Sequence, residues 1–203
     1  MRIPVLERLP KVFTLSTPQH LLGKLRWEVT GFKRAEGAKH HLGWHLTASY
    51  HAANCAITAW HMTDWIWQYL GEPEQRDLAG ALGITSDTLP EFQTYVRNAS
   101  RALNCCRDIA TGSKHMKLTR PGADPDVDAR AVWGPTGGKR GKAEPADKPP
   151  SYTTHLLITD RQGTRPAREV FEEAFTYWDA FMLENGLIED RSIGIRTKRA
   201  PKR

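Results

Sequence analysis

Apolar residues recur three and four positions apart in four segments of the chain, and this spacing predicts the main helices. The four segments are about residues 17–34, 42–70, 88–112 and 166–185. Thr17 followed by Pro18 is typical of a helix start, because the hydroxyl caps free amides and proline suits the first helical position. Thr88 and Glu91 have the spacing of a capping box, and Gly112 and Gly186 are suited to end helices. A shorter helix is expected near residues 74–82.

The segment before the last helix has a different pattern, in which short runs predict β-strands. The candidate strands are His115–Thr119, Val127–Trp133 and Tyr152–Asp160, and residues 134–150, rich in Pro, Gly and Lys, are expected to form a mobile loop. The predicted fold is therefore α+β and mainly α. It has four main helices in a bundle, with a small β-hairpin or three-stranded insertion at about 115–160 before the last helix. Residues 1–190 are expected to form one domain.

Composition and charge indicate a globular protein with a basic tail. The chain has 203 residues, of which 39% are hydrophobic and 26% charged, and its formal net charge is +6. Residues 191–203 carry six basic side chains and no acidic one, so the rest of the chain has equal numbers of both signs. Such a tail attracts polyanions without sequence specificity, and we expect any nucleic-acid binding by it to be of this kind.

Cysteine usage and polarity favour a cytoplasmic protein. Cys55, Cys105 and Cys106 are odd in number, two of them are adjacent, and no secretory signal precedes them. The apolar stretch at residues 43–70 is interrupted by polar side chains in every window long enough to cross a bilayer, so no membrane span is expected. The tryptophans lie mostly at apolar helix positions, which places them in the predicted core.

A line of uncharged polar residues runs along the predicted helix at 42–70. Between His40 and Gly71 the single formally charged side chain is Asp64, whereas a helix facing solvent usually carries Lys and Glu. The line consists of Thr47, His51, Asn54, Thr58, His61, and Asp64 or Gln68. We expect it to be buried or to face a ligand or another subunit. It is either a hydrogen-bonded network that sets helix register or a functional site.

A candidate basic partner lies on the helix predicted at 88–112. With Leu103 at the centre of the apolar face, Arg107 falls at the border with Ser100 and Asn104, which predicts a half-buried guanidinium that needs an anion. By the same projection Arg97, Arg101 and Asp108 point outward. His115 follows the expected helix end at Gly112 and is predicted to fold back over that end, near Arg107.

Residues 107–115, Arg-Asp-Ile-Ala-Thr-Gly-Ser-Lys-His, resemble the Arg-polar-x-His signature of HEPN-type helical bundles. Many of these are metal-independent ribonucleases of toxin and phage-defence systems. The resemblance covers about residues 17–118 and the last helix, although the seven residues between Arg107 and His115 exceed the usual family spacing.

The resemblance implies that His115 acts as a base at a ribose 2′-hydroxyl while Arg107 and Lys114 contact the phosphate. Asp64 or His61 would orient this pair, and Asn104, His51 and Asn54 would contribute to binding. The family also implies an RNA partner and a homodimer with its site at the seam. Either an active endoribonuclease or a degenerate RNA-binding relative fits this description.

Two other functions compete with the ribonuclease. His41 with His45, and His61 with Asp64, have metal-ligand spacing, but a two-metal bundle needs more carboxylates than Asp64, so we expect no metal or cofactor. The stronger alternative is a non-enzymatic interaction module, such as an accessory protein of a phage or mobile element. It would dock a protein partner through the polar line on the helix at 42–70.

Overall fold

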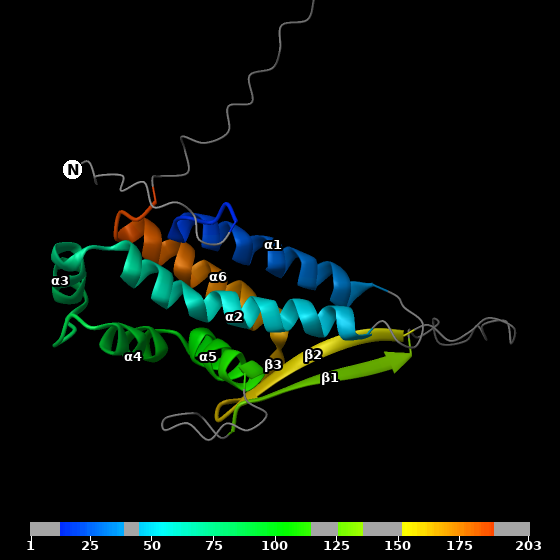
Figure 1. Ribbon diagram of the computed structural model, residues 1–203. Coiled ribbons are helices and arrows are strands. Elements are labelled where there is room, and N and C mark those ends of the chain that lie inside the picture. The colour runs from blue at the N-terminus through cyan, green and yellow to red at the C-terminus, as the bar shows by residue number, and fades with distance from the viewer. Residues whose placement is uncertain (1–12, 39–44, 115–125, 136–151, 189–203) are drawn as a thin grey trace, which may run out of the picture.

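A computed structural model describes residues 13–38, 45–114, 126–135 and 152–188, and it has a mainly helical α+β fold (Figure 1). This fold class was predicted from the sequence and is confirmed. In chain order the elements are α1 (Pro18–Gly37), α2 (His45–Tyr69), α3 (Glu72–Leu82), α4 (Leu89–Ala99), α5 (Arg101–Lys114), β1 (Asp128–Pro135), β2 (Tyr152–Asp160), β3 (Gly163–Pro166) and α6 (Ala167–Glu184).

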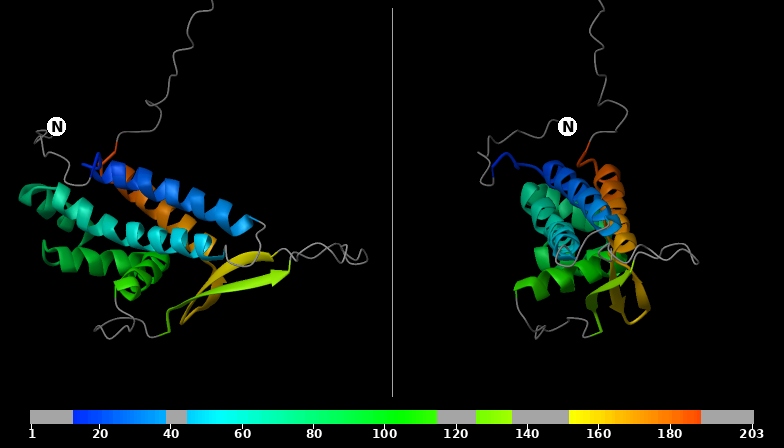
Figure 2. Two further views of the ribbon diagram at one scale, coloured as in Figure 1. Left: turned by 45° about the vertical axis from the view of Figure 1, so that its right-hand side comes forward. Right: turned by 90° about the vertical axis from the view of Figure 1, so that its right-hand side faces the viewer.

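The long helices α1, α2 and α6 lie side by side, α4 and α5 follow the other side of α2, and the sheet lies beyond α5 (Figures 1 and 2). The core forms where these helices meet. Trp178 of α6 is fully buried, and its indole nitrogen donates to the Ala59 carbonyl of α2 at 2.8 Å. Phe32 of α1 packs edge-on against Phe171 of α6. The apolar faces predicted from helical spacing therefore supply this core.

The three strands form an antiparallel sheet in the order β1-β2-β3, with β2 in the centre. The strand β3, which follows Asp160 and precedes the last helix, was not among the strands expected from the sequence. Gly163 adopts a φ of 118°, which glycine accommodates readily and which suits the tight turn into this short strand. Where β3 ends, Glu36 of α1 accepts a hydrogen bond from the Leu156 amide at 3.1 Å.

The predicted helix at 88–112 is two helices, separated at Ser100. The Ser100 backbone is extended, and its Oγ accepts a hydrogen bond from the Leu103 amide at 3.3 Å. The hydroxyl thus caps α5, and this local bond competes with continuation of α4. The prediction that the helix ends at Gly112 is also wrong, because α5 continues to Lys114. Thr88 precedes α4 as expected, but its side chain makes no cap hydrogen bond.

Two other helix ends are as predicted. Thr17 caps α1 by accepting a hydrogen bond from the His20 amide at 3.3 Å, and Gly186 after α6 has the left-handed φ of 67°. The predicted strand at 115–119, most of the loop at 134–150 and the tail at 191–203 lie outside the described residues. Among the helices described, none is long and apolar enough to span a membrane.

Candidate functional site

The acidic and basic side chains at the centre of the predicted site are more deeply buried than expected. Arg107 is 4% exposed rather than half-buried, and Asp108, expected to point outward, is 1% exposed. Arg107 Nη1 lies 3.3 Å from Asp108 Oδ1. The helical projection was wrong because it assumed one apolar face, whereas α5 packs against α2, α4 and α6. Buried charges of opposite sign stabilise one another only when paired in this way.

The remaining residues near this end of α5 are described in part. Asn104, one turn before Asp108, is half-buried at the helix border. His115 and the Lys114 side chain lie outside what the structure describes, so the predicted approach of His115 to Arg107 stays a prediction.

Asp64 of α2 and Arg107 of α5 lie at different positions along the length of α2. Gln93 of α4 donates to Asp64 Oδ1 at 3.3 Å, which places Asp64 opposite α4. Cys106, next to Arg107, is instead close to Cys55. Burial raises the pKa of Cys106, and the neighbouring thiols of Cys105 and Cys55 raise it further. Cys55 and Asp64 are nine residues apart, which corresponds to about 13 Å along a helix. These contacts give no support to Asp64 as the residue that orients Arg107.

The polar line on α2 is only partly buried within this chain. Asn54 is exposed, and His51, His61 and Asp64 are half-buried. Burial within the chain therefore does not account for all four residues, and the alternative that they face another subunit stays a prediction. Thr58 is buried, and its hydroxyl accepts a hydrogen bond from Lys24 Nζ of α1 at 2.6 Å.

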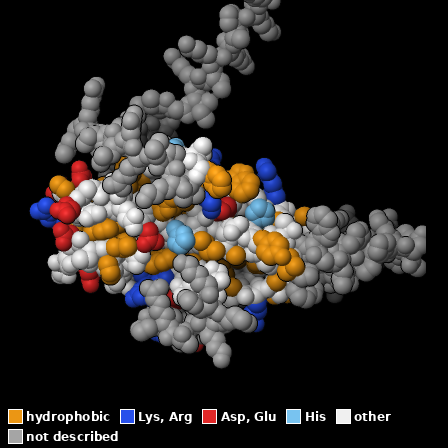
Figure 3. Space-filling view, viewed as in Figure 1, with side chains coloured by type: hydrophobic (Ala, Val, Ile, Leu, Met, Phe, Trp, Pro, Cys, Tyr) orange, Lys and Arg blue, Asp and Glu red, His pale blue; other side chains and the backbone are white. Residues whose placement is uncertain are grey.

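The solvent-facing side of α2, together with one α1 residue, forms a surface that we call the α2 outer face. Its members are all exposed or half-buried, and Asp64 is the one charged side chain among them: Trp27, Leu46, Thr47, Tyr50, Asn54, Ile57, His61, Asp64, Trp65 and Gln68. Trp27 is 68% exposed and Tyr50 63%. Figure 3 shows hydrophobic and histidine side chains gathered over α1 and α2.

Sequence reasoning missed Trp27 because tryptophans at helical positions were assigned to the core. Trp27 instead lies at the α1–α2 seam, where its ring meets the His51 ring edge-on with centroids 6.2 Å apart. Gly31 allows this arrangement, since a Cβ there would lie 2.8 Å from His51 Cε1. Because Gly31 of α1 has no side chain, the His51 imidazole of α2 can pack against α1 at this position.

A polar cluster lies beneath the α2 outer face. Lys24 Nζ bridges Glu28 Oε1 at 2.5 Å and the Thr58 hydroxyl, and Glu28 is buried. The ammonium group thereby neutralises a buried carboxylate and joins α1 to α2. Burial, and secondarily the Glu28 charge, raises the pKa of the nearby Cys55 thiol. A thiol with a raised pKa is a poor nucleophile, so Cys55 acts as a core residue.

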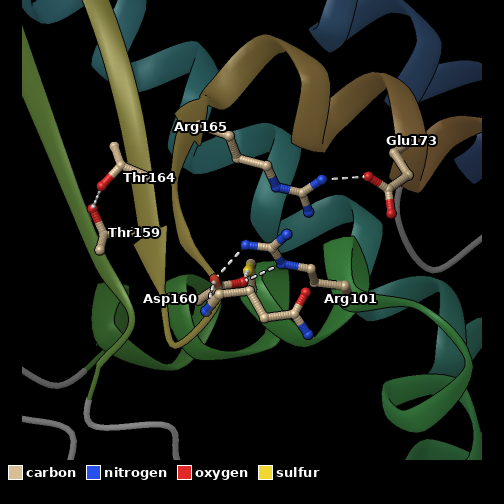
Figure 4. A network of polar contacts seen from close by, with 8 residues as sticks. Arg101, Thr159, Asp160, Thr164, Arg165 and Glu173 are labelled. Atoms are coloured by element: carbon tan, nitrogen blue, oxygen red, sulfur yellow. Dashed lines mark hydrogen bonds and ion pairs between the residues drawn. The ribbon is translucent and has the colours of Figure 1, made fainter.

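A second polar cluster anchors the β2–β3 turn to α5 (Figure 4). Arg101, expected to point outward, donates to both Asp160 oxygens, from Nε at 2.6 Å and Nη2 at 2.5 Å. The Gln162 amide and the Cys105 thiol also donate to Asp160. The hydrogen bonds from Arg101 hold the pKa of Asp160 well below its usual value. Burial, with a smaller effect of Asp160, raises the pKa of Cys105 to about 12.

Comparison with known proteins identifies no relative of this chain. No protein-family model, curated protein or solved structure matches this chain. The described residues also contain no group of three His, Cys, Asp or Glu side chains placed to hold a metal ion. The function must therefore be argued from the surfaces and clusters described above.

Proposed function

We propose that this protein is an interaction module that binds a second copy of itself through the α2 outer face. The observation that carries the proposal is the exposure of Trp27 and Tyr50 on a surface whose charged side chains are Asp64 and, at its border with α1, the 39% exposed Lys24. Contiguous exposed apolar surface of this kind is typical of protein interfaces, where aromatic residues are enriched and charged ones depleted.

The charge of the α2 outer face favours a second copy over a charged partner. With Asp64 and the bordering Lys24 as its charges, the surface has one of each sign and can pack against itself about a two-fold axis without extensive repulsion. It offers an acidic or basic partner few complementary groups.

The size of the face is also sufficient. Trp27, Tyr50 and Leu46 together expose roughly 400 Å², about half of what one partner contributes to a standard interface. The other members of the face supply further area, and the 25 residues of α2 extend over about 37 Å, long enough for two such helices to pack side by side.

The test is the oligomeric state of the full chain, measured by sedimentation equilibrium over a range of concentrations. The wild type is expected to dimerise, and Trp27→Glu or Tyr50→Glu is expected to give monomers that remain folded by circular dichroism. Leu46→Glu is expected to weaken the dimer too, and Leu183→Glu on α6 is its matched control, because Leu183 and Leu46 are both 46% exposed. A monomeric wild type, or a dimer unaffected by Trp27→Glu and Tyr50→Glu, would overturn the proposal.

A second candidate function, the HEPN-like ribonuclease or its degenerate RNA-binding relative, is favoured by the buried pair of Arg107 and Asp108. A buried ion pair gives little stability compared with apolar residues of similar size, so its presence is consistent with a functional role. At 4% exposure, however, the Arg107 guanidinium needs a movement of its surroundings before it can contact a phosphate. The interaction module requires no such change.

A further inference from the structure

Arg165, in β3, has hydrogen-bond donors that no acceptor satisfies. Its Nη1 donates to Glu173 Oε2 of α6 at 2.5 Å (Figure 4). Its Nε and Nη2 are buried and have no hydrogen-bond partner among the residues that the structure describes. These two nitrogens form one edge of the guanidinium, the edge that binds two oxygens of a single carboxylate or phosphate in parallel.

Neighbouring acceptors do not supply what this edge lacks. Besides Glu173, the cluster contains the carboxylate of Asp160, but Arg101, Cys105 and the Gln162 amide already donate to its two oxygens. A buried donor without a partner destabilises the folded protein, and more so when the group is charged. Because such groups are rare in folded proteins, the Arg165 edge is expected to meet an acceptor when the protein works.

A second cation lies beside it. In Figure 4 the Arg101 side chain extends from α5 to Asp160, and in this view its guanidinium lies below that of Arg165, which extends from β3. The charges of both groups lower the pKa of the Cys105 thiol, although burial has the larger, opposite effect. Asp160 pairs with Arg101 and Glu173 with Arg165, but neither carboxylate is hydrogen-bonded to the Nε–Nη2 edge of Arg165.

The cluster is located at the edge of the layer between sheet and helices. The side chains of Arg101 and Arg165 are 31% and 18% exposed, and that of Glu173 is 46% exposed. A small ligand can therefore reach the Arg165 edge when the partly exposed side chains of Arg101 and Glu173 move, without separation of the helices.

We propose that Arg165 binds a phosphoryl group, with two of its oxygens accepting from Nε and Nη2 and with Arg101 as the second cation. The carboxylates of Asp160 and Glu173 oppose this binding, so the affinity depends on the two-point contact as well as on charge. The site is separate from the α2 outer face, and the proposal does not rest on self-association. The phosphoryl group belongs either to free phosphate or to the end of a nucleotide.

Isothermal titration of the full chain with inorganic phosphate, at constant ionic strength in chloride, tests the proposal. Wild type is expected to bind one phosphate per chain. Arg165→Lys keeps the charge but cannot make the two-point contact, so its affinity should fall roughly tenfold or more. Arg168→Gln, a change at an exposed arginine early in α6, is the matched control and should bind as wild type does.

Glu173→Gln provides a second test that does not depend on the folding of the Arg165 variant. The amide oxygen can still accept from Arg165 Nη1, while the opposing charge is lost, so phosphate should bind more tightly. Titration with adenosine 5′-monophosphate then distinguishes the sources, because tighter binding than phosphate indicates a nucleotide end. Absence of phosphate binding by both wild type and Glu173→Gln would overturn the proposal, as would equal affinity in a folded Arg165→Lys variant.

Discussion

The ion pair between Arg101 and Asp160 is expected to be a main attachment of the β2–β3 turn to the helical layer. Arg101→Met removes two charge-assisted hydrogen bonds and leaves a carboxylate that is 8% exposed. Asp160 retains its bonds from the Gln162 amide and Cys105, and Arg101 is partly solvated, so the full cost of an isolated buried charge does not apply. We therefore expect the free energy of unfolding to fall by about 2–3 kcal/mol.

Urea denaturation of wild type, Arg101→Met, Asp160→Asn and the double variant measures this directly. The double-mutant cycle should give a coupling energy of about 1.5–3 kcal/mol, because the two side chains are in contact. Arg168→Met, at an exposed arginine, is the control and should change stability by less than about 0.5 kcal/mol. If Arg101→Met is as stable as this control, the pair does not anchor the turn.

The same pair predicts a pH dependence with a definite sign. Arg101 lowers the pKa of Asp160 in the folded state, so the pair stabilises the fold above the ordinary aspartate pKa. This stabilisation declines as the pH falls toward and through the lowered value. The stability difference between wild type and Arg101→Met should therefore be constant near neutral pH and shrink below about pH 4. A difference that grows with acidification would refute the assignment.

Three further perturbations follow from the contacts described. Ser100→Ala removes the cap of α5 and should cost about 1 kcal/mol in urea denaturation, while Ser100→Asp should retain most of the stability; equal loss in both would argue against the cap. Glu36→Ala leaves the Leu156 amide without its acceptor and should cost about 1–3 kcal/mol, whereas Glu36→Gln should cost less; an unchanged Glu36→Ala would show that the bond is dispensable. Arg107→Ala leaves Asp108 as a buried carboxylate without that ion pair and should cost about 3–5 kcal/mol if the pair is structural. An Arg107→Ala protein that melts as wild type does but loses RNA cleavage would instead support the ribonuclease, and chelator should then have no effect.

The helical framework could be predicted because its signals are local and repeated along the chain. The apolar spacing places Val170 and Trp178 in the core, and Gly186 ends α6 as expected. The break at Ser100 could not be predicted in this way, since neither Pro nor Gly marks it and one hydroxyl decides it. The strand β3 has four residues and gains its structure by pairing with β2, which no local pattern reveals.

The candidate site was less predictable because burial depends on what packs around a helix. The sequence identifies Arg107 and Asp108 as unusual, but their burial results from helices that cover α5 on several sides. The missing charges of α2 were recognised from the sequence and predicted a surface that faces something other than water. Trp27 joins that surface from α1, and its position depends on how the two helices pack against each other at Gly31 and His51.

The hydrogen bond from Leu156 to Glu36 has a consequence for aggregation. Backbone amides alternate in direction along a strand, and the Leu156 amide points to the side on which β3 has already ended. An open amide at this position would invite a strand from another molecule to extend the sheet. The buried carboxylate of Glu36 occupies it, so an incoming strand would have to displace a side chain anchored in α1. The last turn of α1 thereby covers the first position of β2 beyond the end of β3.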